Sequence, residues 1–247
     1  MPKYSICITQ RNNRATVEAS LRSVLDQIDD NFEVVVVDSE SSDGSQEVLR
    51  RFAHDGAIKL VEQRCTRGKG RQIAFENSHG AIVVSNIDMD EVYSPRLVAL
   101  LEAYDRLAEG RVLLALSSIL DEEHGRQNIT IAPRELLRSL GGWHDVNYGE
   151  DWDLWRRAAE REKFAVLVFQ VVTGPDPSAG RPRLRSRYTR YLAMIQLGRE
   201  VFAESEEVHP SQRALYLWAR FVSLFKPRFN GPKKFDPYQQ KYLIRSE

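Results

Sequence analysis

Carboxylates follow directly after two apolar segments in the first hundred residues. Asp88 and Asp90 come after the apolar run Ala81–Val84, and Asp38 ends a segment that contains four consecutive valines. Two aspartates one residue apart suit a hard divalent cation such as Mg²⁺ or Mn²⁺, which takes one or two protein carboxylates and completes its shell with substrate phosphates. Asp38 is placed to accept a hydrogen bond from a base N–H or a ribose hydroxyl. Taken singly, each of these signals also fits a solvated turn.

Two further groups of charged residues extend this chemistry. Four basic residues bracket two glycines in a segment that we expect to form a loop able to approach phosphates: Arg64, Arg67, Lys69 and Arg71. The acidic pair Glu150–Asp151 opens a predicted helix, where the helix macrodipole stabilises a carboxylate. A carboxylate in such a place can act as a general base. A helix cap or a simple first-turn charge is the structural alternative.

The apolar periodicity predicts the elements that must position these residues. Segments typical of strands alternate with segments of helical period, which predicts a parallel α/β sheet. The predicted strands are 4–9, 32–37, 58–61, 81–86 and 112–119, and the helices between them are 16–27, 45–52, 71–77 and 95–108. Ligands bind beyond the carboxyl ends of the strands in such sheets. We therefore expect residues 9–11, 38–40 and 88–90 to share one rim.

Past residue 120 the strict alternation stops. Two glycines and a tryptophan predict a turn at 141–143, followed by a helix at 150–162 and an apolar strand at 164–172. Two further helices are predicted at about 188–204 and 211–225. These elements extend the sheet and add a helical C-terminal region.

The composition is that of an ordinary globular chain. Of the 247 residues, 42% are apolar and 28% are charged. The two cysteines fit neither a disulfide framework nor a zinc site, so we expect an intracellular, cytoplasmic protein. The N-terminus leads straight into a predicted strand, which argues against a signal peptide. No apolar run approaches the ~20 residues that a membrane-spanning helix needs.

The formal net charge is zero, but the charge is unevenly distributed. Residues 1–180 hold 21 Lys and Arg against 29 Asp and Glu, whereas residues 181–247 hold 14 against 6. A basic tail on an acidic body predicts an anionic partner for the tail, with a solvated polar face as the alternative. The stretch "ALYLWARFVSLF" (214–225) is apolar nearly all round, and basic residues follow it. We expect it to lie in a membrane interface or to pack against the domain.

Taken in order, these motifs resemble glycosyltransferase family 2, the inverting nucleotide-sugar enzymes of the GT-A fold. The resemblance runs from Lys3 to about Val172 and rests on "SICITQRNN", "LRSVLDQIDDNFEVVVVDSESSDGS", "RGKGRQIAFENSHGAIVVSNIDMDE" and "GGWHDVNYGEDWDLWRR". It implies a mostly parallel α/β sheet flanked by helices. A Rossmann-like donor-binding half would occupy residues 1–92, an acceptor-binding half residues 93–176, and a C-terminal helical extension residues 177–247.

The resemblance also implies roles for residues that match the family's motifs. The donor-binding residues would be Thr9, Arg11, Asp38, Arg71 and Asp88. Asp90 would be the direct metal ligand, with Asp88 next to it and closer to the ribose. In the acidic pair, Asp151 would be the general base beside Glu150.

Other assignments follow the family pattern less closely. Arg183, Arg185 and Arg187 would approach the donor diphosphate, and Trp152 would wall the acceptor sugar unless it packs in the core. Asp176 stands near the place where many relatives carry a histidine that assists the metal or the diphosphate. Two positions depart from the family: Arg11 replaces a common aromatic or small polar residue, and Glu91 replaces a frequent third aspartate.

The resulting prediction is an inverting enzyme that depends on Mn²⁺ or Mg²⁺. It would move a sugar such as a hexose or mannose from a UDP- or GDP-sugar to a hydroxyl or phosphate of a glycan or lipid-linked acceptor, at the cytoplasmic face of a membrane. We expect no nucleic-acid partner. The alternatives are a sugar nucleotidyltransferase, which would not need the Glu150–Asp151 pair, and a non-catalytic nucleotide-sugar-binding module.

Overall fold

The computed structural model describes residues 1–108, 113–117, 128–168, 184–197, 213–229 and 243–244. Within these residues, eight strands form one sheet. The strands are β1 (Tyr4–Gln10), β2 (Phe32–Asp38), β3 (Lys59–Glu62), β4 (Ile82–Ile87), β5 (Leu113–Ser117), β6 (Asn128–Pro133), β7 (Phe164–Val168) and β8 (Leu243–Ile244). Their order across the sheet is β3-β2-β1-β4-β6-β5-β7-β8. The sheet is mostly parallel, because β6 alone runs antiparallel to its neighbours β4 and β5 in this part of the chain.

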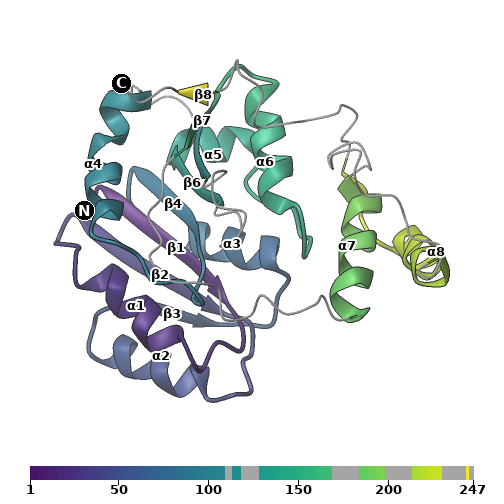
Figure 1. Ribbon diagram of the computed structural model, residues 1–247, viewed down its shortest axis with the longest axis horizontal. Helices are drawn as coiled ribbons and strands as arrows, with labels where there is room; N and C mark the ends of the chain where they lie inside the picture. Colours follow the sequence, from purple (N-terminus) through teal and green to yellow (C-terminus); the bar gives the residue numbers. More distant parts are fainter. Residues whose placement is uncertain (109–112, 118–127, 169–183, 198–212, 230–242, 245–247) are drawn as a thin grey trace.

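Helices cover both faces of the sheet and continue beyond it (Figure 1). The helices are α1 (Val17–Leu25), α2 (Ser45–His54), α3 (Arg67–Glu76), α4 (Arg96–Ala108), α5 (Arg134–Leu140), α6 (Glu150–Ala159), α7 (Leu184–Leu197) and α8 (Arg213–Val222), which a 3₁₀ turn (Ser223–Phe225) extends. None of the helices in the described residues is long and apolar enough to cross a membrane.

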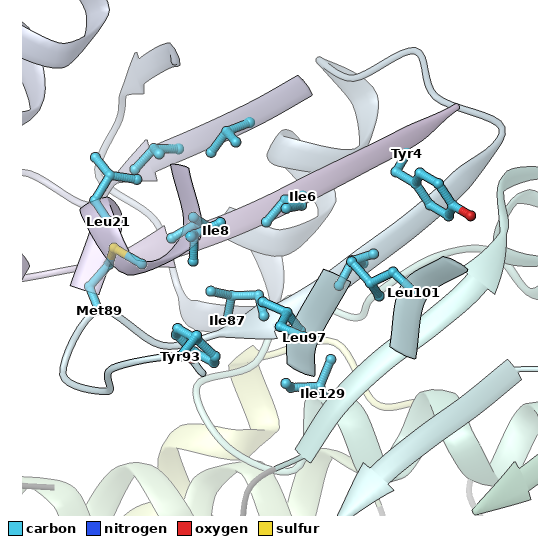
Figure 2. Packing of buried hydrophobic residues seen from close by; sticks show 14 of the residues in the cluster. Tyr4, Ile6, Ile8, Leu21, Ile87, Met89, Tyr93, Leu97, Leu101 and Ile129 are labelled. Atoms are coloured by element: carbon cyan, nitrogen blue, oxygen red, sulfur yellow. The ribbon is translucent and has the colours of Figure 1, made fainter. Parts of the chain in front are cut away.

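Alternating side chains of the central strands build a separate core on each face. Ile6 and Ile8 of β1 face α1, α2 and α4, whereas Cys7 faces α3, α5 and α6. Figure 2 shows the first of these cores, in which Ile6 and Ile8 lie with Leu21 and Leu97. The four valines of β2 divide in the same way, which is the pattern expected of a strand that is buried on both sides.

The predicted elements are largely confirmed in the first hundred residues, and the register confirms their shared rim. Gln10 lies opposite Asp38, Asp38 lies opposite Glu62 and Ile8 lies opposite Ile87, so the carboxyl ends of β1, β2, β3 and β4 reach the same edge. The alternation failed to predict β6 and α5, which occupy the segment between the predicted fifth strand and the turn at 141–143. The predicted helix 71–77 begins four residues too late, because α3 already starts at Arg67 and so includes part of the basic segment.

The C-terminal helices stand beside the sheet as a separate layer. Helix α7 packs on the segment before α6, where Ala193 and Leu197 bury Val146. Helix α8 packs on α7 and lies on its far side from the sheet (Figure 1). For the stretch 214–225, packing is thus observed on one side only: α8 packs on α7, while its outer apolar side chains stay exposed.

Candidate functional site

The loop after β4 presents its carboxylates at the sheet edge because α1 holds its backbone. The hydroxyl of Thr16 donates to the Met89 carbonyl oxygen at 2.7 Å, and the hydroxyl of Ser20 donates to the Asp88 carbonyl oxygen at 3.2 Å. Met89 itself is buried in the core. The Asp88 side chain is left exposed and Asp90 is half-buried. Hydrogen bonds from α1 and its N-cap thus hold the backbone of the loop, while both carboxylates stay at the edge of the sheet.

Tyr93 closes this loop from the other side. Its hydroxyl accepts a hydrogen bond from the Asp88 backbone N–H at 2.8 Å and donates to the Glu91 carboxylate at 2.9 Å. Burial and the neighbouring carboxylates of Glu91 and Asp88 raise the pKa of Tyr93 well above its usual value, so the phenol stays protonated. Glu91, which replaces the family's frequent third aspartate, is therefore engaged in holding the loop.

Asp38 ties three segments together at the end of β2. Its buried carboxylate accepts hydrogen bonds from the Gln10 side chain, from the Ser41 backbone N–H at 2.8 Å and hydroxyl at 2.6 Å, and from the Gln46 side chain at 2.9 Å. The carboxylate thereby sets the shape of the rim between β1 and β2. Two other predicted donor-binding residues flank it, with Thr9 half-buried and Arg11 exposed.

The basic segment is a helix, and its glycines serve packing. The prediction of a phosphate-approaching loop at 64–71 is wrong, because α3 begins at Arg67 behind Thr66, whose hydroxyl caps the helix by accepting from the Lys69 N–H. A Cβ on Gly68 would lie 2.0 Å from the His144 carbonyl oxygen. One on Gly70 would lie 2.4 Å from a Thr9 methyl carbon. The two glycines therefore let α3 approach β1 and the segment before α6.

This close approach brings Arg71 onto the acidic pair of α6. The Arg71 guanidinium contacts the Glu150 carboxylate and lies 3.0 Å from Asp151 Oδ1. The three side chains are 5%, 1% and 12% exposed, so the cluster is largely removed from water. Arg67 adds a more distant contact, with Nε 3.8 Å from Glu150 Oε1. Of the four basic residues in the segment, Arg71 is the one that is buried.

Glu150 and Asp151 point into this cluster because of how α6 begins. Gly149 precedes the helix with φ of 72°, in the left-handed region that glycine tolerates without strain. The first turn then carries both carboxylates, where the helix macrodipole favours negative charge. Burial raises the pKa of Asp151, and the positive charges of Arg71 and Arg67 counteract part of that rise.

Asn86 connects the acidic pair to the loop after β4. It hydrogen bonds the Asp151 side chain, and its φ of 67° is unusual for a residue other than glycine. Asn86 is the extra residue of a β-bulge, because Cys7 pairs with Ser85 whereas Ile8 pairs with Ile87. Bulges of this kind re-aim a side chain and occur often beside active sites. Asn86 was not among the predicted site residues, although a polar residue at the end of an apolar strand was a visible signal.

Asp88 also acts electrostatically on the cluster of Arg71 with the acidic pair. Burial has the largest effect on both groups, raising the pKa of Asp151 and lowering that of Arg71, and the negative charge of Asp88 raises both pKa values. The structure thus brings together four of the predicted residues from three elements: Arg71, Asp88, Glu150 and Asp151. Asp90 lies two residues further along the same loop.

Asp88 and Asp90 fit a divalent cation of the kind that shares its shell with a substrate. No group of three or more Asp, Glu, His or Cys side chains is gathered for a metal ion within the described residues. However, Mg²⁺ or Mn²⁺ commonly binds only one or two protein carboxylates. Phosphate oxygens of the substrate and water then supply the remaining ligands. The cluster of Arg71 with the acidic pair lies beside them rather than among the ligands.

Trp152, which was predicted to wall the acceptor sugar, and the two aromatic residues Trp143 and His144 before α6 pack against other parts of the chain. Trp143 is buried in the core with its ring 6.1 Å from that of Phe75. Trp152 is half-buried. It lies between the core formed with α3, α5 and α6 and the small cluster in which α7 covers Val146. His144 places Nδ1 2.7 Å from Asp153 Oδ2 and stacks on Phe229 with ring centres 4.0 Å apart. The C-terminal region therefore covers the segment that leads into α6.

The arginines predicted near the donor diphosphate fall at or beyond the limits of the description. Arg185 and Arg187 stand in the first turn of α7, and their side chains are outside the described residues. Arg183 and Asp176 lie outside the described residues altogether. Their predicted roles stay predictions.

Comparison with known proteins agrees with this geometry. Residues 5–145 match the family described as glycosyl transferase family 2. The match covers more than half of the chain, and the chain therefore belongs to glycosyl transferase family 2. The predicted family and its α/β fold are confirmed.

Individual relatives are similar over only part of their length. An uncharacterized protein of Mycobacterium tuberculosis, MT1568, is 29% identical over 171 residues, which are 69% of this chain and 48% of that protein. The undecaprenyl-phosphate 4-deoxy-4-formamido-L-arabinose transferase of Aeromonas hydrophila is 35% identical over 115 residues, 41% of this chain and 34% of that one. The chain thus spans between about a third and a half of these curated relatives.

Among solved structures, the fold is similar to that of the mannosyltransferase PcManGT from Pyrobaculum calidifontis, determined in complex with GDP-Man and Mn²⁺. The TM-score is 0.61 at 22% identity, and the similarity covers 91% of this chain and 70% of that one. At this level of identity the comparison concerns the fold.

Proposed function

We propose that this chain transfers a sugar from a nucleotide-sugar donor to a hydroxyl acceptor with inversion at the anomeric carbon. One observation carries the proposal: a bulge in β4, the start of α6 and a buried arginine of α3 converge on Asp151 next to the carboxylates of the β4 loop. Family membership supports a nucleotide-sugar donor, and the donor site is proposed to lie in residues 1–92. The acceptor half would be residues 93–176, with 177–247 as an extension.

Asp151 would act as the general base. A carboxylate whose pKa is raised by burial is a stronger proton acceptor than an exposed one, while the positive charge of Arg71 favours its ionised form. It would take the proton from the acceptor hydroxyl. The acceptor oxygen then forms its bond to the anomeric carbon as the bond from that carbon to the diphosphate oxygen breaks, and the nucleoside diphosphate leaves with the bonding electrons.

The neighbours of Asp151 would orient it for this step. Asn86 hydrogen bonds its side chain, and Arg71 lies 3.0 Å from Oδ1. Glu150 contacts the same guanidinium nitrogen, Nη1, so that Arg71 is shared between two carboxylates. Arg71 is thus proposed to position the base, and Glu150 to position Arg71.

Asp88 and Asp90 would hold Mg²⁺ or Mn²⁺ together with the donor. The cation would supply positive charge that stabilises the departing diphosphate. The mannosyltransferase PcManGT, whose fold is similar, was determined in complex with GDP-Man and Mn²⁺. This supports a divalent metal ion at Asp88 and Asp90. The protein's part is to keep the two carboxylates on the rim, which the hydroxyls of Thr16, Ser20 and Tyr93 do by holding the backbone.

We further propose a lipid-linked or phosphate-bearing acceptor that is met at the face of a membrane. The name of the Aeromonas relative includes undecaprenyl phosphate, a lipid-linked phosphate. The basic C-terminal region of this chain and the contact of α7 with the segment before α6 support the same class of acceptor.

The substitution Asp151→Asn tests the proposed base. The variant should fold and bind donor like the original chain, because the amide has nearly the same shape, but its transfer rate should fall about 10²-fold or more. Asp145→Asn, an exposed carboxylate six residues earlier, is the matched control and should keep its rate. Donor affinity is measured by calorimetry and transfer by nucleoside diphosphate release with an acceptor. Near-normal turnover of the Asp151 variant would reject the role.

A further inference from the structure

Helix α8 is apolar on two opposite faces. Its inner face packs on α7, where Ala219 is buried and Leu215 and Tyr216 lie against Tyr191 and Met194. Its outer face carries large apolar side chains that are between 52% and 75% exposed: Leu217, Trp218, Phe221, Leu224 and Phe225. Their spacing of three, four and seven residues places them in one continuous stripe on the helix.

The stripe is a structured surface rather than scattered exposure. Trp218 stacks on Phe221 with ring centres 5.7 Å apart, and Phe221 meets Phe225 edge to face at 5.6 Å. Single exposed apolar residues are common, but a contiguous patch of this kind marks a surface that another body covers. Among the helices of the described residues, α8 lies on the far side of α7 from the sheet (Figure 1).

Positive charge surrounds this stripe. Arg213 and Arg220 lie two helical turns apart and so share one edge of α8, and Lys226 and Arg228 follow directly after the 3₁₀ turn. All four side chains are exposed, and residues 213–229 contain no acidic residue. The patch therefore combines aromatic and apolar contact area with cations alone.

We propose that the outer face of α8 docks on the surface of an anionic lipid bilayer. Aromatic and apolar side chains enter the interface, while Lys and Arg interact with anionic headgroups. Two such signals together give the reversible anchoring that neither gives alone. Pairing with a second copy through the same face is disfavoured, because a two-fold interface would place the four cations of one patch against those of the other.

Docking at this face would place the candidate site close to the bilayer. One side of α7 packs against α8, and the other side buries Val146 and contacts Trp152 near the start of α6. Arg190 of α7 also lies over the Tyr148 ring at 4.8 Å. Helix α7 alone thus separates α8 from the segment that leads into α6 and Asp151. The docking itself rests on α8 alone, and only its link to a lipid-linked acceptor rests on the proposed function.

Vesicle flotation of the full chain tests the docking. Vesicles of phosphatidylcholine with phosphatidylglycerol should carry the protein at low salt, and binding should weaken as salt screens the charges. Replacing the aromatic residues together, Trp218→Ser, Phe221→Ser and Phe225→Ser, should lower the partition coefficient at least about tenfold. Lys226→Gln with Arg228→Gln should lower it about 25-fold, or about fivefold for each charge. Arg138→Gln with Arg161→Gln, an equal change of charge on α5 and after α6, should leave it unchanged.

Three results would overturn the proposal. The first is that the full chain ignores anionic vesicles at low salt, and the second is that the aromatic triple variant still binds them while its melting temperature shows that it is folded. The third is a dimer in sedimentation that the triple variant abolishes, since the face would then be an interface between copies. Nucleoside diphosphate release measured without vesicles reports on the transferase independently of all three.

Discussion

Removal of the buried cation Arg71 should destabilise the protein strongly. The substitution Arg71→Met keeps an unbranched side chain but removes the guanidinium, and leaves Glu150 and Asp151 facing each other with the exposed Arg67 as the nearest remaining positive charge. Breaking a buried ion pair by removing one partner costs about 3–5 kcal/mol, because the other charge stays buried. That loss is a large fraction of the ~5–15 kcal/mol by which a typical domain is stable. Urea unfolding, read as a shift of the midpoint at constant slope, measures it.

The loss should depend on pH in a definite direction. Burial already raises the pKa of Asp151, and removal of Arg71 takes away the positive charge that opposes this rise. A carboxyl whose pKa is higher in the folded state destabilises the fold as pH rises through the interval between its unfolded and folded pKa values. The deficit of the variant should therefore be smallest in acid and should grow toward neutral pH.

Two companion variants make the measurement decisive. Arg67→Met removes an exposed arginine of the same helix and should cost only about 0–1 kcal/mol. Arg71→Met combined with Glu150→Gln should cost less than the sum of the single changes, because the double variant no longer buries an uncompensated Glu150 charge. If Arg71→Met costs no more than Arg67→Met at neutral pH, the buried cluster does not form and the positioning of Asp151 has no basis.

Further predictions concern packing, protonation and metal binding. Gly68→Ala should destabilise the chain by about 1–3 kcal/mol or more, because its methyl group would meet the backbone oxygen of His144, and thermal unfolding against Lys69→Ala as a helix control measures this. The transfer rate should fall as pH is lowered through the raised pKa of Asp151, and a profile set by a group with the usual aspartate pKa of ~3.9 would contradict the assignment. Asp90→Asn should weaken binding of a nucleoside diphosphate with Mn²⁺ while EDTA has little further effect on it, and equal affinity of the original chain with and without EDTA would remove the metal from the account.

The sequence was sufficient for the parts of the site that follow strand ends. Parallel strands place their carboxyl ends at one edge, so the alternation of apolar segments alone predicts that residues near Asp38 and Asp88 share a rim. The helix start at Glu150 was equally visible, since two carboxylates precede an apolar stripe. These features depend on local pattern and on one topological rule.

The remainder depends on contacts between distant segments, which local pattern does not contain. Glycines at 68 and 70 indicated a loop, whereas tertiary packing of α3 against β1 and the 144–146 segment requires them within a helix. The bulge at Asn86 exists only in the pairing of β4 with β1. Strand β6 is short and antiparallel, so it broke the alternation on which the prediction relied. Helix α8 was predicted, but only the packing on α7 determines which of its apolar faces stays exposed.

The most direct test of the proposed transferase is the release of nucleoside diphosphate from a panel of nucleotide sugars. UDP- and GDP-sugars are incubated with the chain and Mn²⁺, with and without EDTA, and the released nucleotide and the anomeric configuration of the sugar product are followed by NMR. At least one donor should yield its nucleoside diphosphate, the sugar product should be inverted, and EDTA should stop the release. Formation of pyrophosphate with a nucleoside monophosphate product would indicate nucleotidyl transfer instead. Donor binding without any turnover across the panel and a set of sugar and lipid-phosphate acceptors would contradict the claim that this chain is an active transferase.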